Sequence, residues 1–174
     1  MITIISCTNR KSSVSKVISE FYQELLSRAG EKSSILDLQD LPADFVLSAL
    51  YENTGKNTTF NQMTELIINS GKFVFVVPEY NGSFPGVLKA FIDGMAHPVS
   101  FKDKKCALVG LSSGVQGGAL ALSHLTDIFN YLGMHVLALK VRMPGIEKLL
   151  TDGRIDDKLI LELLDVQIKD LVNF

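Results

Sequence analysis

Cysteine is scarce in this sequence, and tryptophan is absent altogether. Cys7 and Cys106 are the only two thiols, and they form no C-x-x-C pair. Two cysteines are too few for an iron–sulfur cluster or a structural zinc site. They fit a reducing compartment, where thiols remain reduced. We therefore expect a cytoplasmic protein that holds no metal.

The sequence also lacks a charge imbalance and any long apolar run. Its 17 basic and 19 acidic residues give a net charge of −2, which argues against a nucleic-acid partner and against an electrostatic membrane anchor. No apolar stretch approaches the length of a membrane span. The first residues, M-I-T-I-I-S-C-T, lack the charged segment and the cleavage site of a signal peptide. We expect neither nucleic acid nor membrane as a partner.

What the sequence does contain is a globular composition, 47% hydrophobic and 21% charged. A length of 174 residues suits one domain with a well-buried core. We therefore expect a single domain over residues 1–174.

Short β-rich runs alternate with amphipathic segments, and no internal repeat is visible. We expect strands at 2–6, 34–38, 73–77, 105–110 and 134–139. We expect helices at 14–29, 43–51, 58–69 (capped by Thr58 or Thr59), from Pro85 to about 95, 119–132 and 155–172, with a linker at 97–103 and an irregular stretch at 140–152. This alternation predicts an α/β three-layer fold with a five-stranded parallel sheet in the flavodoxin-like order 2-1-3-4-5.

The segment 73–94 is the most informative unit. Its apolar run F-V-F-V-V reads as a strand buried on both faces of a parallel sheet. Pro78 ends the run because proline has no N–H for a sheet ladder, and Pro85 suits the first turn of the helix that follows. The loop between them should lie at the carboxyl end of the strand, where ligands bind in open α/β sheets.

The loop C-T-N-R-K-S-S at 7–13 precedes a helix. Unpaired N–H groups and the positive dipole end of a helix favour an anion. Thr8, Ser13 and Ser15 add hydroxyl groups, and Arg10 adds a planar cation suited to phosphate. On this loop alone, phosphate binding and simple helix capping by Ser12 or Ser13 are equally supported. The glycine fingerprint of dinucleotide-binding domains and the G-K-[ST] P-loop are both missing.

Two further loops should open on the same edge of the sheet. Glu79–Ser83 offers backbone groups that can read a planar heterocycle. Tyr80 and Phe84 can either stack on such a ring or cover the core or a subunit contact. The loop S-S-G-V-Q-G-G at 112–118 has glycines that allow a backbone to approach a ligand closely. Each loop alone is weak evidence, but together the three predict one ligand site.

These loops resemble those of the NADPH-dependent FMN reductase family, flavodoxin-like enzymes that include quinone, azo-dye and chromate reductases. The first loop is similar to the family's G-S-x-R-x-x-S phosphate loop, and the third to its S-x-G-x-x-G-G segment. The most specific match is P-E-Y-N-G-S-F-P-G-V-L-K-A-F-I-D at 78–93, which resembles P-x-Y-N-x-S-x-P-G-x-L-K-N-x-x-D. The resemblance covers roughly residues 2–133.

The resemblance implies which residues hold FMN. The phosphate would be bound by Thr8, Arg10, Ser13 and Ser15. The isoalloxazine and ribityl chain would be lined by Pro78, Glu79, Tyr80, Asn81 and Ser83, and the ring approached by Ser113, Gly114 and Gly117. No catalytic side chain is implied, because flavin N5 carries the chemistry.

The sequence departs from the family pattern at three positions. Cys7 and Thr8 replace the usual glycine and serine, and Ala90 replaces the usual asparagine. Thr8 keeps a hydroxyl, whereas Cys7 can either tighten the turn or weaken affinity. A cysteine in a phosphate loop also suggests a tyrosine phosphatase. That chemistry needs an arginine six positions later, where this sequence has Ser13.

We therefore expect an FMN-dependent NAD(P)H oxidoreductase that passes a hydride from NADPH or NADH through FMN to a small-molecule electron acceptor: a quinone, an azo compound, a metal oxyanion or free flavin. One alternative is a flavodoxin-type electron carrier without NAD(P)H turnover, although such carriers are strongly acidic and have a T-x-T-G-x-T loop. Another is a non-catalytic module that binds no flavin. The loops at 43–57 and 140–152 should set the choice of acceptor.

The remaining candidates are assigned no chemistry. His97 reads more readily as a structural or interface histidine than as a proton donor, and His124 and His135 are left unassigned. Phe45, Leu47, Leu50 and Tyr51 either roof the site or meet another subunit, and the subunit contact is favoured. The family resemblance implies a homodimer or homotetramer.

Overall fold

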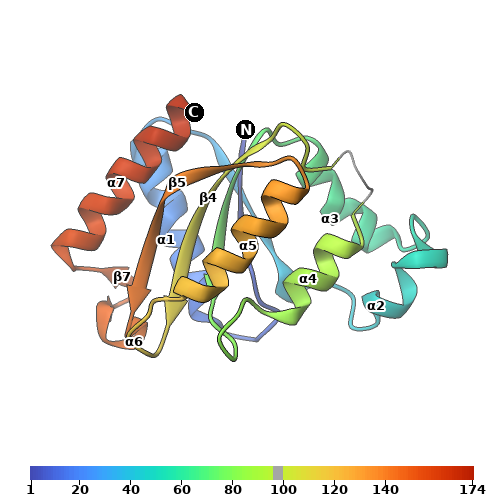
Figure 1. The fold of residues 1–174 in the computed structure, drawn as a ribbon, viewed down its shortest axis with the longest axis horizontal. Coiled ribbons are helices and arrows are strands. Elements are labelled where there is room, and N and C mark those ends of the chain that lie inside the picture. Colours follow the sequence, from blue (N-terminus) through green and yellow to red (C-terminus); the bar gives the residue numbers. More distant parts are fainter. Residues whose placement is uncertain (96–99) are drawn as a thin grey trace.

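A five-stranded parallel sheet forms the centre of the molecule (Figure 1). The computed structural model describes residues 1–95 and 100–174, so His97 and Pro98 of the predicted linker 97–103 lie outside the described residues. The strands follow the order β2-β1-β3-β4-β5, the flavodoxin-like order predicted from the sequence. They are β1 (Ile2–Ser6), β2 (Ser33–Asp37), β3 (Lys72–Pro78), β4 (Lys105–Ser112) and β5 (His135–Pro144).

Helices cover both faces of this sheet (Figure 1). One face carries α1 and α7, and the other carries α3, α4 and α5. The helices are α1 (Val14–Arg28), α2 (Phe45–Ser48), α3 (Thr58–Ile68), α4 (Gly86–Asp93), α5 (Ala119–Tyr131), α6 (Ile146–Leu149) and α7 (Lys158–Asn173), with 3₁₀ turns at Leu38–Asp40 and Tyr51–Asn53.

The apolar run of β3 explains its central position. Every side chain from Phe73 to Val77 is fully buried, because alternate residues point into the two helical layers. Phe73 and Phe75 join the layer under α3, α4 and α5, whereas Val74 and Val76 join the layer under α1 and α7. Pro78 is the last residue of the strand, as predicted.

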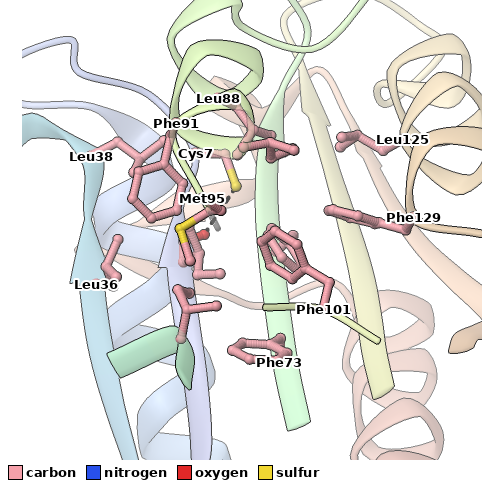
Figure 2. Close-up of a cluster of buried hydrophobic side chains, with 14 of the residues drawn as sticks. Cys7, Leu36, Leu38, Phe73, Leu88, Phe91, Met95, Phe101, Leu125 and Phe129 are labelled. Atoms are coloured by element: carbon pink, nitrogen blue, oxygen red, sulfur yellow. Dashed lines mark hydrogen bonds between the residues drawn. The ribbon is translucent and has the colours of Figure 1, made fainter. Parts of the chain in front are cut away.

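Cys7 belongs to the hydrophobic core (Figure 2). Its side chain is fully buried in the same cluster as Leu38, Leu88 and Phe91. The thiol donates a hydrogen bond to the carbonyl of Ile5 at 3.2 Å. Burial raises the pKa of the Cys7 thiol well above its ordinary value. Cys7 is therefore a neutral core residue rather than a thiolate nucleophile, which agrees with the rejection of phosphatase chemistry.

The chain from 140 to 152 is more regular than the sequence suggested. β5 continues to Pro144, α6 follows, and β6 (Leu150–Thr151) pairs with β7 (Arg154–Ile155) in an antiparallel hairpin. The prediction ended β5 too early because Val141 and Met143 are buried while Arg142 is exposed. In an edge strand of this kind, buried apolar residues alternate with exposed polar residues, so the sequence shows no continuous apolar run.

The N-terminal cap of α3 also differs from the prediction. The residue that caps α3 is Asn57, whose side chain accepts the Phe60 N–H at 3.0 Å. The predicted caps, Thr58 and Thr59, are already inside the helix. At α1 the cap is Ser13, one of the two predicted candidates.

Within residues 1–95 and 100–174, none of the helices combines the length and the apolar character needed to cross a membrane.

Candidate functional site

A cavity of about 280 Å³ lies where the loops after β1, β3 and β4 meet. All three loops follow the carboxyl ends of parallel strands, so they open on one edge of the sheet, as predicted. The short helix α6 supplies a further wall. The lining residues are Thr8, Arg10, Ser12, Ser13, Val14, Ser15, Pro78, Glu79, Tyr80, Leu111, Ser112, Ser113, Ile146 and Glu147.

Eight of the twelve predicted site residues line this cavity. They are Thr8, Arg10, Ser13, Ser15, Pro78, Glu79, Tyr80 and Ser113. The other four, Asn81, Ser83, Gly114 and Gly117, lie in the same loops but not in the cavity lining. The loops therefore converge as expected, although each contributes only part of its predicted set.

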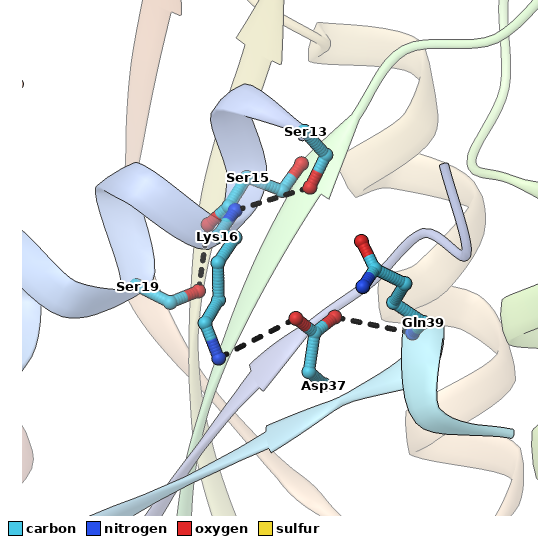
Figure 3. Close-up of polar contacts among 6 residues, drawn as sticks. All are labelled: Ser13, Ser15, Lys16, Ser19, Asp37 and Gln39. Atoms are coloured by element: carbon cyan, nitrogen blue, oxygen red, sulfur yellow. Dashed lines mark hydrogen bonds and ion pairs between the residues drawn. The ribbon is translucent and has the colours of Figure 1, made fainter. Parts of the chain in front are cut away.

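The first turn of α1 faces the cavity and contains an unusual buried hydroxyl (Figure 3). Ser13 caps the helix, its Oγ accepting the Lys16 N–H at 3.3 Å. Ser15 is only 1% exposed, yet its Oγ has no hydrogen-bond partner among the described residues. A buried hydroxyl without a partner costs free energy. Its position on the cavity wall, beside the positive end of a 15-residue helix, suits an anionic ligand.

The ion pair between Lys16 and Asp37 fixes this turn to the end of β2 (Figure 3). The Lys16 Nζ lies 3.4 Å from Asp37 Oδ2, and Asp37 also accepts the Gln39 N–H at 3.1 Å. Lys16 is therefore engaged with a carboxylate of its own chain and is not among the cavity-lining residues.

The hydroxyl of Thr8 joins the first two loops. Its Oγ1 lies 2.8 Å from the hydroxyl of Tyr80 and accepts the Arg10 N–H at 3.3 Å. Thr8 is 1% exposed, and both contacts are partly buried. The contact sets the spacing of the two loops, because it connects the first loop directly to Tyr80 of the second loop.

The second loop closes as a tight turn. Tyr80 and Ser83 exchange two backbone hydrogen bonds, of 2.8 and 3.1 Å. Asn81 and Gly82 occupy the two positions between them, with φ of 52° and 77°. Both angles are left-handed, which asparagine and glycine tolerate best. Asn81 is thus at the exposed tip of the turn, which explains its absence from the cavity lining.

His124, to which the sequence gave no role, holds this turn from α5. Its Nδ1 lies 2.9 Å from the Ser83 Oγ. The sequence could not predict this contact, because the two residues are 41 positions apart and come together only in the folded chain. The contact explains why Ser83 is directed toward α5 rather than the cavity. Phe84, beside it, packs against the hydrophobic core, one of its two predicted roles.

The third loop is held together by Ser112. Its hydroxyl donates to the Gly114 carbonyl at 2.9 Å and accepts the Gly117 N–H at 2.8 Å. Gly117 has φ of +60°, and a Cβ added there would lie 2.9 Å from Cβ of Arg142. Gly117 therefore approaches the backbone of β5 closely. This close approach explains why the position requires glycine, whether or not a ligand is bound.

Glu147 is the main functional candidate that the sequence did not reveal. Its Oε1 accepts a 2.6 Å hydrogen bond from the Ser113 hydroxyl. That bond, Glu147's own backbone N–H and the nearby Arg10 cation hold the pKa of the Glu147 carboxyl below its ordinary value. The residue falls in the stretch 140–152, which the sequence predicted to be irregular and to set the choice of acceptor, but no pattern singled out Glu147 itself. Ser12, Val14, Leu111, Ser112 and Ile146 complete the unpredicted lining.

Glu79 carries a second unsatisfied polar atom. One of its carboxylate oxygens, Oε2, is buried without a hydrogen-bond partner among the described residues. Because Glu79 and Ser15 both line the cavity, the site holds a buried acceptor near the second loop and a buried hydroxyl at α1. A ligand with hydroxyl groups and a phosphate matches both.

A larger cavity of about 520 Å³ lies between α4 and α5, away from these loops. It is lined mainly by apolar side chains, among them Ile92, Met95, Phe101 and Leu132. Its described lining includes neither the N-terminus of a long helix nor a cluster of hydroxyl groups. Its chemistry does not suit a phosphorylated ligand, so the smaller cavity is the candidate site.

Curated relatives share parts of this chain. It is 39% identical over 69 residues to a 2-hydroxy-1,4-benzoquinone reductase from a Burkholderia species, covering 38% of each protein. It is 34% identical over 111 residues to an NAD(P)H-dependent FMN reductase from Pseudomonas aeruginosa, covering 62% of this chain and 60% of that one. The chain thus spans less than two thirds of these two relatives. It is 26% identical to a quinone reductase from Pseudomonas putida, over 90% of this chain and 85% of the relative.

Solved structures and a family model agree with the fold and the loops. A flavoenzyme NAD(P)H:(acceptor) oxidoreductase from Paracoccus denitrificans superposes with a TM-score of 0.78 at 23% identity, covering 99% of this chain and 94% of that one. This likeness concerns the fold. The model of the NADPH-dependent FMN reductase family matches residues 1–145, which include all three loops. The chain therefore belongs to the NADPH-dependent FMN reductase family.

Proposed function

We propose that the protein is an FMN-dependent NAD(P)H oxidoreductase that reduces a small-molecule acceptor. The observation that carries this proposal is the unpartnered Ser15 hydroxyl, buried at the N-terminus of α1 and facing the cavity. A phosphate there would satisfy the hydroxyl and meet the free N–H groups of the helix. The family of the chain favours a flavin phosphate over other anions.

The residues of the first loop would hold the phosphate. Arg10 is exposed, and among the described residues no carboxylate makes an ion pair with it. Its guanidinium is therefore available for a bidentate contact. Ser13 and Ser15 would add hydroxyl contacts, while Thr8 holds the loop against Tyr80.

The second and third loops would hold the rest of the cofactor. Pro78, Glu79 and Tyr80 line the cavity next to the phosphate loop, so they would border the ribityl chain and the ring. The unpaired Oε2 of Glu79 would accept a hydrogen bond from a ribityl hydroxyl. Asn81, Ser83, Gly114 and Gly117 would act by shaping the two loops.

The chemistry that FMN supplies when bound is hydride transfer from NAD(P)H to a second acceptor. The chain's own residues bind and orient it, and no acid–base side chain is required of them. Relatives named as quinone or benzoquinone reductases support a quinone as the acceptor. A benzoquinone is therefore the first acceptor to test.

We further propose a homodimer or homotetramer in the cytoplasm. Large side chains are strongly exposed on two parts of the surface: Leu47 and Tyr51 near α2, and Tyr131 on α5. Exposed apolar groups of this size are typical of subunit contacts. Two buried, unpaired cysteines suit a reducing compartment. Light scattering on a sizing column would give the assembly state, and a monomer would contradict the proposed oligomer.

The proposal is tested by titrating the protein with FMN and following flavin fluorescence, and then by adding NADPH without oxygen. We expect saturable FMN binding, bleaching of the flavin absorbance, and renewed NADPH oxidation when a benzoquinone is added. Bound flavin that stays yellow with both NADPH and NADH would instead indicate an electron carrier. If no FMN binds, the flavin assignment is wrong.

Arg10→Ala gives a residue-level test. We expect FMN binding to weaken by about 1.5–3 kcal/mol, the scale of a hydrogen bond to a charged group. Arg28→Ala is the matched control, because Arg28 lies at the other end of α1 and, within residues 1–95 and 100–174, forms an ion pair with Glu24 alone. Equal FMN affinities in the two variants would remove Arg10 from the phosphate role.

A further inference from the structure

The charges that line the cavity are unusual for a site that holds an anion. Among the described lining residues, Arg10 is the only cation, whereas Glu79 and Glu147 are both carboxylates. Two lysines also lie near the first turn of α1: Lys16 is paired with Asp37, and the exposed Lys11 is not among the lining residues. The cavity therefore carries more acidic than basic side chains, although its helix end and hydroxyls suit a phosphate.

Glu147 is held at the site in its charged form. Ser113 donates to its carboxylate at 2.6 Å, which fixes the side chain against the third loop. The hydrogen bonds and the Arg10 charge favour ionisation, as the lowered pKa of its carboxyl indicates. At neutral pH the residue brings a full negative charge to the cavity lining, within reach of the Arg10 charge.

This carboxylate lines the same cavity as Ser13 and Ser15, the residues at the N-terminus of α1. Salt screens charges only partly when they lie closer together than the Debye length, which is about 8 Å at physiological ionic strength. Arg10 interacts with both anions: it would bind the FMN phosphate, and its charge also stabilises the ionised carboxylate of Glu147.

We infer that Glu147 opposes the phosphate of FMN and weakens its binding, so that the flavin exchanges with solution. This inference rests on the proposed function, since it concerns the same site. The residue lies just beyond residues 1–145, the part of the chain that the family model matches. Like charges disfavour each other, and Glu147 also competes with the phosphate for Arg10.

The test compares FMN with riboflavin, which lacks the phosphate. Glu147→Gln removes the charge but keeps the size and an oxygen that accepts the Ser113 hydroxyl. We expect the variant to bind FMN about two- to fivefold more tightly, the range for an exposed charge pair, and to release it more slowly. Riboflavin affinity should not change, and the FMN gain should shrink at high salt.

Glu162→Gln is the matched control. Glu162 is exposed on α7, and among the described residues its ion-pair partner is Lys158 alone, so its substitution should leave both affinities unchanged. Unchanged or weaker FMN binding in Glu147→Gln overturns the inference. An equal change for FMN and riboflavin also overturns it, because the carboxylate would then act on the ribityl chain or the ring.

The two proposals fail in different ways. If the wild-type protein binds neither flavin, the proposed function and this inference both fail. If it binds FMN that NADPH reduces but Glu147→Gln behaves like the wild type, the oxidoreductase proposal stands and Glu147 has no part in flavin exchange.

Discussion

The hydroxyl oxygens of Thr8 and Tyr80 lie 2.8 Å apart, and this contact joins the loop after β1 to the loop after β3. Both residues line the candidate site. Thr8 stands where the family usually has serine, and its hydroxyl is used within the protein, by Tyr80 and by the Arg10 N–H. The departure from the family pattern thus preserves the hydrogen-bonding group that sets the loop spacing.

Tyr80→Phe tests this contact. We expect the free energy of unfolding of the flavin-free protein to fall by about 0.5–1.5 kcal/mol, because the substitution leaves the buried Thr8 hydroxyl with one partner fewer. Urea denaturation measures the change. Tyr131→Phe is the matched control, since Tyr131 is 85% exposed on α5. If both variants are equally stable, the two loops are not held by this hydrogen bond.

The two serines at the start of α1 should respond to alanine in opposite ways. Ser13→Ala removes the helix cap, so we expect the flavin-free protein to lose about 0.5–2 kcal/mol of stability. Ser15→Ala removes a buried hydroxyl that has no partner in the described part of the chain, so the stability of this variant should stay the same or rise by up to about 1 kcal/mol. Denaturation of the flavin-free variants measures both changes.

FMN affinity gives the second half of the serine test. Ser15→Ala should weaken FMN binding by about 1.5–3 kcal/mol, because the phosphate loses a hydrogen bond to a charged group. A variant that is as stable as the wild type but binds FMN poorly would support a binding role for Ser15. If Ser15→Ala instead destabilises the protein as much as Ser13→Ala, its hydroxyl has a structural role.

The sequence predicted the sheet order because the three inner strands, β1, β3 and β4, are almost completely buried and read as apolar runs. Phe73–Val77 is buried on both faces and has no polar interruption. The second half of β5 was missed because Arg142 alternates with the buried Val141 and Met143. An edge strand exposes every second side chain to solvent, so a strand prediction that looks for a continuous apolar run ends at the first exposed polar residue.

The candidate site was predictable only where a loop directly follows a strand. Thr8, Arg10 and Tyr80 were found in that way, since the ends of neighbouring parallel strands meet. Glu147 was missed because it reaches the site through α6, after the chain has left the sheet. His124 was missed because its partner, Ser83, is distant in sequence. Such contacts depend on tertiary packing, which spacing along the chain does not encode.

Two glycines of the third loop should differ in their tolerance of a side chain. Gly117→Ala places a Cβ 2.9 Å from Arg142 Cβ at a φ of +60°, so we expect a loss of about 1–3 kcal/mol in stability. Gly114→Ala meets nothing within 4 Å and should cost less than about 0.5 kcal/mol. Thermal unfolding measures both.

Flavin binding by the same variants tests whether Gly114 approaches the cofactor. Because the Cβ of Gly114→Ala meets no protein atom, any loss of FMN affinity in this variant arises from the ligand itself. Unchanged affinity would mean that Gly114 serves only the loop, where its carbonyl accepts the Gly145 N–H at 2.9 Å and the Ser112 hydroxyl.

The buried thiols should make stability depend on pH in the alkaline range. Burial raises the pKa of both Cys7 and Cys106 in the folded protein, whereas a thiol in the unfolded chain has a pKa of about 8.5. Below that value both states keep the thiol proton. As pH rises above it, the unfolded chain releases the proton and the folded protein does not. The free energy of unfolding should therefore fall by up to about 1.4 kcal/mol per pH unit for each thiol.

Cys106→Ala isolates one of the two thiols. Tyr22, whose pKa burial raises, and Lys104, whose pKa burial lowers, remain in both proteins, so their contributions cancel in the comparison. We expect a variant less stable near neutral pH, because buried volume is lost, but with a shallower decline between about pH 8.5 and about pH 10. Urea denaturation across this range, with reductant present, gives both slopes. Parallel slopes would mean that Cys106 ionises as readily in the folded protein as in the unfolded chain, which contradicts its burial beneath α5.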